Sequence, residues 1–433
     1  MPGNAIGKYR WTIVTLLFFA TTINYLDRQV IGLLKDTLGR EFNWSEEDYS
    51  HIVIAFTTAY AVGLFLFGKF IDIIGTKLGY VLSIIVWSLS AMAHSIVRST
   101  LGFGIARSAL GLGESGNFPA AIKGVAEWFP KKERALATGI FNSGSNVAAM
   151  IGPPAVAWLL IRFGWRSAFI WTGAIGFIWL IFWYRYYDTP ARARAKGLSE
   201  AEFDYIHSDE GEEALTEKPT PISWGKVLGV KQTWAFVLGK FLTDPVWWFY
   251  LFWIPSYFNT TFGMNLSKSW IDVSILYTVS SFGSIMGGHL SGWFIKRGMP
   301  VYKARKTAMF LFALCVLPIM FIRFTDNVWV AVGLLSLAAA AHQAWSANIF
   351  TTASDMFPKH AVGSVVGIGG MAGSVGGILF PFFIGRLLDH FKLLGHLSAG
   401  YNIIFVICGF AYLVAWVVMH FLCRQMTRVT NLN

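Results

Sequence analysis

The sequence predicts an all-α polytopic membrane protein with twelve transmembrane helices in two six-helix halves. Hydrophobic residues make up 55% of the 433 residues and charged residues only 14%, and the mean hydropathy is +0.52. Runs of about 20 apolar residues, the length that crosses a bilayer as a helix, recur along the whole chain. This composition is typical of a chain that crosses the membrane many times.

The twelve spans follow from these apolar runs. We expect them at 11–34, 50–74, 78–97, 101–126, 136–161, 167–186, 232–258, 268–295, 306–323, 328–354, 361–388 and 400–422. A hydrophilic stretch rich in Glu, Arg, Lys and Pro separates the sixth span from the seventh. We therefore predict an N-terminal six-helix bundle at 1–187, a cytoplasmic linker at 188–231 and a C-terminal six-helix bundle at 232–433.

An internal repeat supports the division into halves. Residues 129–153 and 357–381 share seven identities at a constant offset of 228, without a gap. Halves repeated in the same orientation, with a substrate site between them near the membrane midplane, are typical of transporters that work by alternating access. A channel would instead need a continuous polar stripe along one pore.

The basic residues indicate the topology. They cluster in alternate loops, at 75–77, 130–134 and 296–306 and in the linker, whereas the loop at 35–50 is rich in acids. Because loops rich in Lys and Arg stay in the cytoplasm, both termini and the linker are expected there. We expect a multi-pass protein of the bacterial inner membrane, monomeric and in contact with lipid, with no nucleic-acid partner.

The stretch NYLDR places an acid and a base inside the first span. Asp27 and Arg28 each cost about 2.5 to 3.5 kcal/mol at such depth, and intramembrane charges usually mark a transport pathway. Arg28 lies three positions after Tyr25 and four after Asn24, so the three side chains share one helix face. The planar guanidinium matches a carboxylate, so this face is a candidate anion site.

The fourth span carries a second pair of charges. Arg107 and Glu114 are seven residues apart, so they share one helix face about 10 Å apart. A carboxylate in apolar surroundings suits a reversible proton carrier, and Asp27, next to Arg28, is placed to sense bound substrate. The alternative that these four charges only form buried ion pairs that fix helix packing stays open.

The stretch GKFIDIIGTK at 68–77 contains a candidate gate. Gly68 and Gly75 permit close helix approach and a tight turn, Asp72 can satisfy a helix end or pair with a base, and Lys77 reaches the membrane surface. The stretch resembles the G-x-x-x-D-x-x-G-x-K/R signature of the major facilitator superfamily, where it braces the cytoplasmic gate. The stretch at 291–298 is a degenerate copy without the acid.

Two longer motifs narrow the resemblance. NYLDR and the segment 106–139, ARSALGLGESGNFPAAIKGVAEWFPKKERALATG, are similar to the anion:cation symporter family, and the resemblance extends over essentially the whole chain. It implies a major facilitator fold, a substrate carboxylate on Arg28, and proton coupling through Asp27 and Glu114 with Arg107. Tyr60 matches a tyrosine on the ligand side of that family.

The second half suggests the kind of anion. A sugar acid needs a cation for its carboxylate, amides and hydroxyls for its ring oxygens, and an aromatic face for its C–H surface. The seventh and tenth spans supply these groups in Lys240, Asp244, Trp248, Tyr250, His342, Gln343, Asn348 and Thr351, and the fifth span adds Ser145 and Asn146. These stretches resemble the hexuronate branch of the family, whose members carry glucuronate and galacturonate. Each polar residue taken singly could instead serve helix packing.

The sequence contains no enzyme signature. HExxH, a GxSxG elbow in the required strand-turn context and paired metal-binding cysteines are all missing, so we expect no enzyme, no cofactor and no metal. We predict a secondary active transporter that imports a hexuronate by symport with protons. Another sugar acid such as an aldonate, an organic monocarboxylate, sodium as the coupling ion, and a receptor that binds without translocating stay open.

Overall fold

The computed structural model describes residues 6–209, 223–263 and 270–430, and its regular secondary structure within these ranges is entirely helical. This confirms the all-α prediction. The first group of helices contains α1 (Tyr9–Leu33), α2 (Lys35–Phe42), α3 (Glu46–Ile74), α4 (Thr76–Ala93), α5 (Thr100–Glu114), α6 (Asn117–Trp128), α7 (Lys131–Phe163) and α8 (Trp165–Tyr186). We call this group the N-half.

The second group, the C-half, follows three short connecting helices, α9 (Pro190–Ala195), α10 (Glu200–Ile206) and α12 (Trp224–Leu228). It contains α13 (Lys231–Phe252), α14 (Ile254–Phe262), α15 (Trp270–Lys296), α16 (Val301–Val316), the 3-10 helix η1 (Leu317–Phe324), α17 (Val328–Met356), the 3-10 turn η2 (Lys359–Ala361), α18 (Val362–Leu393) and α19 (Leu397–Leu422). Residues 210–222 of the predicted linker lie outside the described residues. The first two residues of the predicted eighth span, 268–269, also lie outside them. The domain boundaries stay a prediction.

Local sequence signals set several helix ends. Ser45 and Asp48 form a capping box at the start of α3, in which each side chain accepts a hydrogen bond from the other residue's backbone N–H. Gly75 and Gly164 have positive φ angles of 87° and 80° at the turns that follow α3 and α7. Residues with a Cβ rarely adopt this conformation, so glycine permits these sharp reversals.

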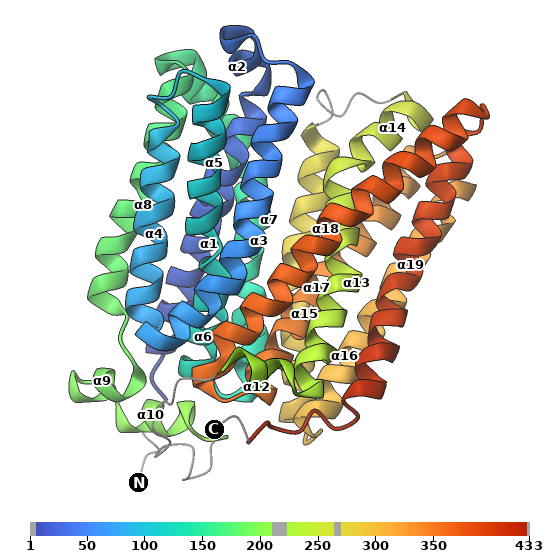
Figure 1. Ribbon diagram of the computed structural model, residues 1–433. Helices are drawn as coiled ribbons and strands as arrows, with labels where there is room; N and C mark the ends of the chain where they lie inside the picture. The colour runs from blue at the N-terminus through green and yellow to red at the C-terminus, as the bar shows by residue number, and fades with distance from the viewer. Residues whose placement is uncertain (1–5, 210–222, 264–269, 431–433) are drawn as a thin grey trace.

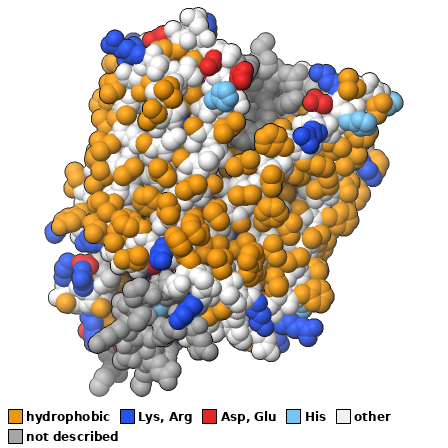
Figure 2. Space-filling model, in the orientation of Figure 1, with side chains coloured by type: hydrophobic (Ala, Val, Ile, Leu, Met, Phe, Trp, Pro, Cys, Tyr) orange, Lys and Arg blue, Asp and Glu red, His pale blue; other side chains and the backbone are white. Residues whose placement is uncertain are grey.

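Length and hydropathy identify the membrane-spanning helices. Within the described residues, eight helices are long and apolar enough to cross a membrane, four in each half. The other predicted spans correspond to α1, the α5–α6 pair, α13 and α15. Figure 2 shows hydrophobic side chains in a broad band over both halves, with Lys and Arg gathered toward the two ends. This distribution fits a protein surrounded by lipid.

The fourth span differs from the continuous helix expected at 101–126. α5 ends at Glu114 and α6 starts at Asn117. The Ser83 hydroxyl donates to the Gly113 carbonyl at 2.6 Å, and the Asn24 amide donates to the Glu114 carbonyl at 3.5 Å. Pro119 has no N–H to donate to the Ser115 carbonyl four residues earlier, so the helix breaks at 115–116, beside Glu114. Side chains from α4 and α1 satisfy carbonyls at the break.

The two halves lie side by side and meet toward the end of the molecule that carries both termini, which we call the termini end (Figure 1). Glycines allow the backbones to touch there. A Cβ on Gly68 would lie 2.4 Å from the Gly363 carbonyl oxygen, and one on Gly139 would lie 2.2 Å from the Ser284 carbonyl oxygen. These contacts join α3 to α18 and α7 to α15, so the halves are closed against each other at the termini end.

Candidate functional site

A cavity lies between the two halves and is lined by residues of both. Nine of the predicted substrate-site residues line it: Tyr25, Arg28, Tyr60, Ser145, Lys240, Asp244, Trp248, His342 and Gln343. The sequence analysis did not select several other lining residues, among them Phe118, Asn142, Trp247, Ser346, Phe350 and Ser374. A polar cavity rimmed with aromatic rings between two repeated halves is the arrangement expected for a transported sugar derivative.

Arg28 is the positive charge of the cavity wall in the N-half. Its Nε donates to Glu114 Oε2 at 2.8 Å, and its guanidinium lies 4.6 Å from the Tyr25 ring and 4.5 Å from the Tyr60 ring. The Arg28 side chain is 12% exposed, whereas that of Glu114 is fully buried. The base therefore faces the cavity, and the acid that neutralises it lies behind.

Only one carboxylate oxygen of Glu114, Oε2, accepts a hydrogen bond from a side chain of the described residues. Oε1 has no hydrogen-bond partner among the described residues, and the same holds for both oxygens of Asp27. Asp27 is buried, does not line the cavity, and interacts electrostatically with Glu114 and Arg107. Arg107 donates to the Arg28 carbonyl at 3.2 Å, while its Nε and Nη1 make no hydrogen bond within the described chain. The structure thus brings the four charges into one cluster with unused hydrogen-bonding capacity.

The cavity wall of the C-half contains a second ion pair. Lys240 Nζ lies 2.7 Å from Asp244 Oδ2, one helical turn further along α13, and 4.1 Å from the centre of the Phe350 ring. Lys240 is therefore paired before any substrate arrives. Asp244 is followed by Pro245, which cannot donate a backbone hydrogen bond inside α13.

Aromatic and amide groups complete this wall. The His342 ring stacks on Trp247 with ring centres 4.9 Å apart, and its Nδ1 lies 2.5 Å from the Tyr412 hydroxyl oxygen. The Asn142 amide of α7 donates to Gln343 Oε1 of α17 at 2.8 Å. Gln343 therefore links the halves as well as lining the cavity.

Four predicted site residues lie elsewhere. Asn146 accepts a hydrogen bond of 3.4 Å from the Gln343 amide but does not line the cavity. Asn348 donates to the Gly287 carbonyl at 3.0 Å, which joins α17 to α15, and the Thr351 hydroxyl donates to the Asn348 carbonyl. Tyr250 is buried on α13. On α13 and α17, helical periodicity turns Tyr250, Asn348 and Thr351 away from the faces that carry Lys240 and His342.

The predicted gate residue Asp72 connects the halves. Its carboxylate accepts hydrogen bonds from Lys123 Nζ at 2.9 Å and from the backbone N–H groups of Gly363 and Ser364 at 3.0 Å and 2.6 Å. Those N–H groups belong to the first turn of α18, where a negative charge is stabilised by unpaired donors and by the helix dipole. An acid of the N-half thus caps a helix of the C-half.

Lys77, the other charged residue of the 68–77 stretch, stays within the N-half. Its Nζ lies 3.7 Å from Asp188 Oδ2, at the end of α8. Partial burial opposes ionisation of Asp188, but the hydrogen bond from Lys196 and the nearby Lys77 charge together lower the pKa of this carboxyl group. Gly75 supplies the preceding turn, and a Cβ there would meet no atom within 4 Å.

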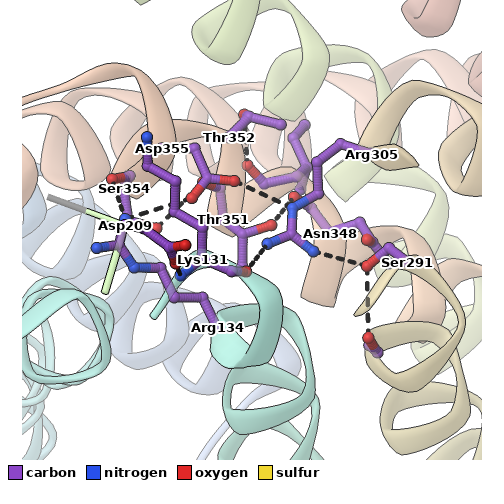
Figure 3. Close-up of polar contacts among 12 residues, drawn as sticks. Lys131, Arg134, Asp209, Ser291, Arg305, Asn348, Thr351, Thr352, Ser354 and Asp355 are labelled. Atoms are coloured by element: carbon purple, nitrogen blue, oxygen red, sulfur yellow. Dashed lines mark hydrogen bonds and ion pairs between the residues drawn. The ribbon is translucent and has the colours of Figure 1, made fainter. Parts of the chain in front are cut away.

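A second cluster at the termini end, which the sequence analysis missed, is centred on Asp355 (Figure 3). This buried carboxylate pairs with Arg134 of the N-half at 3.3 Å and with Arg305 of the C-half at 3.0 Å. Arg305 also donates to the Lys131 carbonyl at 2.7 Å. Asp355 lies 228 positions after Glu127, the offset of the internal repeat, and this spacing could have identified it.

We expect Asp355→Asn to open the termini end. Removing one partner of a buried ion pair costs about 3–5 kcal/mol, and the part of this cost that comes from the pair with Arg134 falls on the closed arrangement, because only that pair joins the two halves. Hydrogen–deuterium exchange should therefore rise at 131–136 and 362–367. The matched control is Arg166→Gln, which removes an ion pair with Glu41 within the N-half and should leave both segments unchanged. Unchanged exchange in Asp355→Asn would rule out a gating role for the cluster.

Comparison with known proteins gives consistent matches. Residues 17–381 match the family model of the Major Facilitator Superfamily. The chain is 33% identical to a hexuronate transporter of Escherichia coli strain K12 over 388 residues, 89% of each chain. It is 32% identical to a galacturonate transporter of Dickeya chrysanthemi over 67% of this chain and 84% of that protein. A solved structure of the proton:xylose symporter XylE, bound to 6-bromo-6-deoxy-D-glucose, has a similar fold, with a TM-score of 0.73 at 16% identity and 95% coverage of both chains.

Proposed function

Because the chain belongs to the major facilitator superfamily, we propose that it is a secondary active transporter that imports a hexuronate, such as glucuronate or galacturonate, together with protons. The superfamily consists of transporters, so the prediction that the chain is not an enzyme is confirmed. The predicted resemblance and the twelve-helix major facilitator fold are confirmed as well.

The observation that carries the proposal is the ion pair between Arg28 and Glu114 at the cavity wall. An incoming carboxylate meets Arg28 from the cavity, while Glu114 holds the same guanidinium from behind. The two arginines and two acids of the cluster together are neutral, so the substrate carboxylate adds an uncompensated negative charge to a buried site, which is costly. A proton on Glu114 removes that charge, so substrate and proton favour each other's binding.

Asp27 extends the same argument. It lies buried beside Glu114 and Arg107, with Thr172 close to its carboxyl group. Two acids in one apolar cluster cannot both stay charged without cost, so the cluster can carry a proton between them. Arg107 compensates the charge that remains.

The contacts at the termini end support alternating access. Asp72 and Asp355 join the halves at the termini end, so this end is the closed gate. Release of substrate on that side requires the contacts of Asp72 and those of Asp355 with the other half to break. We propose that this end faces the cytoplasm, as the basic loops predict, that the protein lies in the inner membrane, and that a single chain forms the whole transport unit.

The experiment is uptake of labelled glucuronate into proteoliposomes with an inward proton gradient, with unlabelled galacturonate, galactonate, glucose and lactate as competitors. Competition by hexuronates alone supports the proposal. Strong competition by galactonate or lactate would instead identify the substrate as an aldonate or a simple monocarboxylate. Saturable glucuronate binding without any uptake or counterflow would identify a receptor.

A further inference from the structure

The two ion pairs of the cavity expose opposite partners. In the N-half, the base is exposed and the acid is buried: the Arg28 side chain is 12% exposed and that of Glu114 0%. In the C-half, the order is reversed: the Lys240 side chain is 6% exposed and that of Asp244 22%. The cavity therefore presents a positive charge on one wall and a negative charge on the other.

Groups on the two walls lie within electrostatic range of each other. Tyr25 and Tyr60 stack on the Arg28 guanidinium, and both hydroxyls also interact electrostatically with Asp244. Arg28 and Asp244 both line the cavity. A ligand that occupies it meets a cation at one end and a carboxylate at the other.

The position of Asp244 is built into the packing. A Cβ on Gly373 would lie 2.1 Å from Asp244 Oδ2, so glycine at 373 leaves α18 room for this carboxylate in its present position. On its other side, Lys240 is held between Asp244 and the Phe350 ring. The Asp244 carboxylate is thus held by Lys240, and this pairing neutralises the Lys240 charge although Lys240 also lines the cavity.

We propose that Asp244 determines substrate specificity by restricting the cavity to sugar acids with a carboxylate at one end only. This inference rests on the proposed function. A hexuronate places its carboxylate on Arg28 and its far hydroxyls against Asp244, which accepts their hydrogen bonds. An aldarate such as galactarate has carboxylates at both ends, so its second carboxylate meets Asp244. Like charges brought together in a partly buried site exclude the wrong ligand.

The test is equilibrium binding to the purified full chain, followed by the fluorescence of Trp247 and Trp248, which line the cavity. For the wild type, galactarate should bind at least about tenfold more weakly than galacturonate. In Asp244→Asn, this ratio should fall at least about tenfold, because the repulsion is gone and Lys240 is no longer neutralised. Asp244→Glu, the matched control, keeps the charge and should keep the discrimination.

The double variant Lys240→Gln/Asp244→Asn leaves no buried charge unpaired and serves if the single variant does not fold. It too should lose discrimination. Equal binding of galactarate and galacturonate by the wild type, or unchanged discrimination in a folded variant without Asp244, would overturn the inference while leaving hexuronate transport intact. Failure of the wild type to bind any hexuronate would instead overturn the proposed function.

Discussion

Arg28→Ala should abolish high-affinity binding of the hexuronate. Truncating one partner of a buried, hydrogen-bonded charge pair costs about 2–5 kcal/mol, which is about 30- to 3,000-fold in affinity. Arg28 is the more exposed of the two cations named in the cavity lining, and Lys240 is paired with Asp244. The loss should be measured as the dissociation constant for glucuronate, by the fluorescence of the cavity tryptophans.

Two controls separate the charge from the shape of the side chain. Arg28→Lys keeps the charge but loses the planar fork, so its affinity should fall between those of the wild type and Arg28→Ala. Arg166→Gln alters an arginine outside the cavity and should bind like the wild type. An Arg28→Ala protein that is folded and binds glucuronate within threefold of the wild type would contradict the placement of the carboxylate.

Glu114→Gln should separate transport from the proton gradient. Glutamine has the shape of the acid and its carbonyl oxygen can still accept from Arg28 Nε, but it cannot take up and release a proton. We expect accumulation of glucuronate driven by an inward proton gradient to be lost, while exchange of internal for external glucuronate continues. Both are measured in proteoliposomes with the same labelled substrate.

Glu47→Gln is the matched control for this variant. Glu47 is an exposed acid at the start of α3, and its removal should change neither accumulation nor exchange. If Glu114→Gln accumulates glucuronate like the wild type, Glu114 is not the coupling residue, and Asp27→Asn becomes the variant to test.

Much of the fold was predictable because the length of the apolar runs indicates the membrane-spanning helices and the internal repeat indicates two similar halves. The helices lie where the apolar runs predicted them, and the repeat anticipated two similar groups. The break between α5 and α6 had a signal in Pro119, which has no N–H to donate to the Ser115 carbonyl four residues earlier. The hydrogen bonds from Ser83 and Asn24 to the carbonyls of Gly113 and Glu114 were not predictable, because these side chains come from other helices.

The members of the candidate site were predictable where their spacing along one helix places them on the same face. Tyr25 and Arg28 lie together as their spacing requires, and both line the cavity. The partners of charged groups were harder to predict, because pairing depends on tertiary packing. The positive charge of Lys240 suggested an anion site, yet Lys240 pairs with Asp244 one helical turn away. Asp355 joins the two halves only through its ion pairs with Arg134 and Arg305, which lie on other helices.

The most direct test of the account is whether the substrate carries protons with it. Glucuronate should be added outside proteoliposomes that hold a pH-sensitive dye, with the same pH on both sides at the start. We predict that the interior becomes acidic as glucuronate enters, and that Arg28→Ala and Glu114→Gln both remove this signal. Entry of labelled glucuronate into wild-type proteoliposomes without any acidification would contradict proton symport.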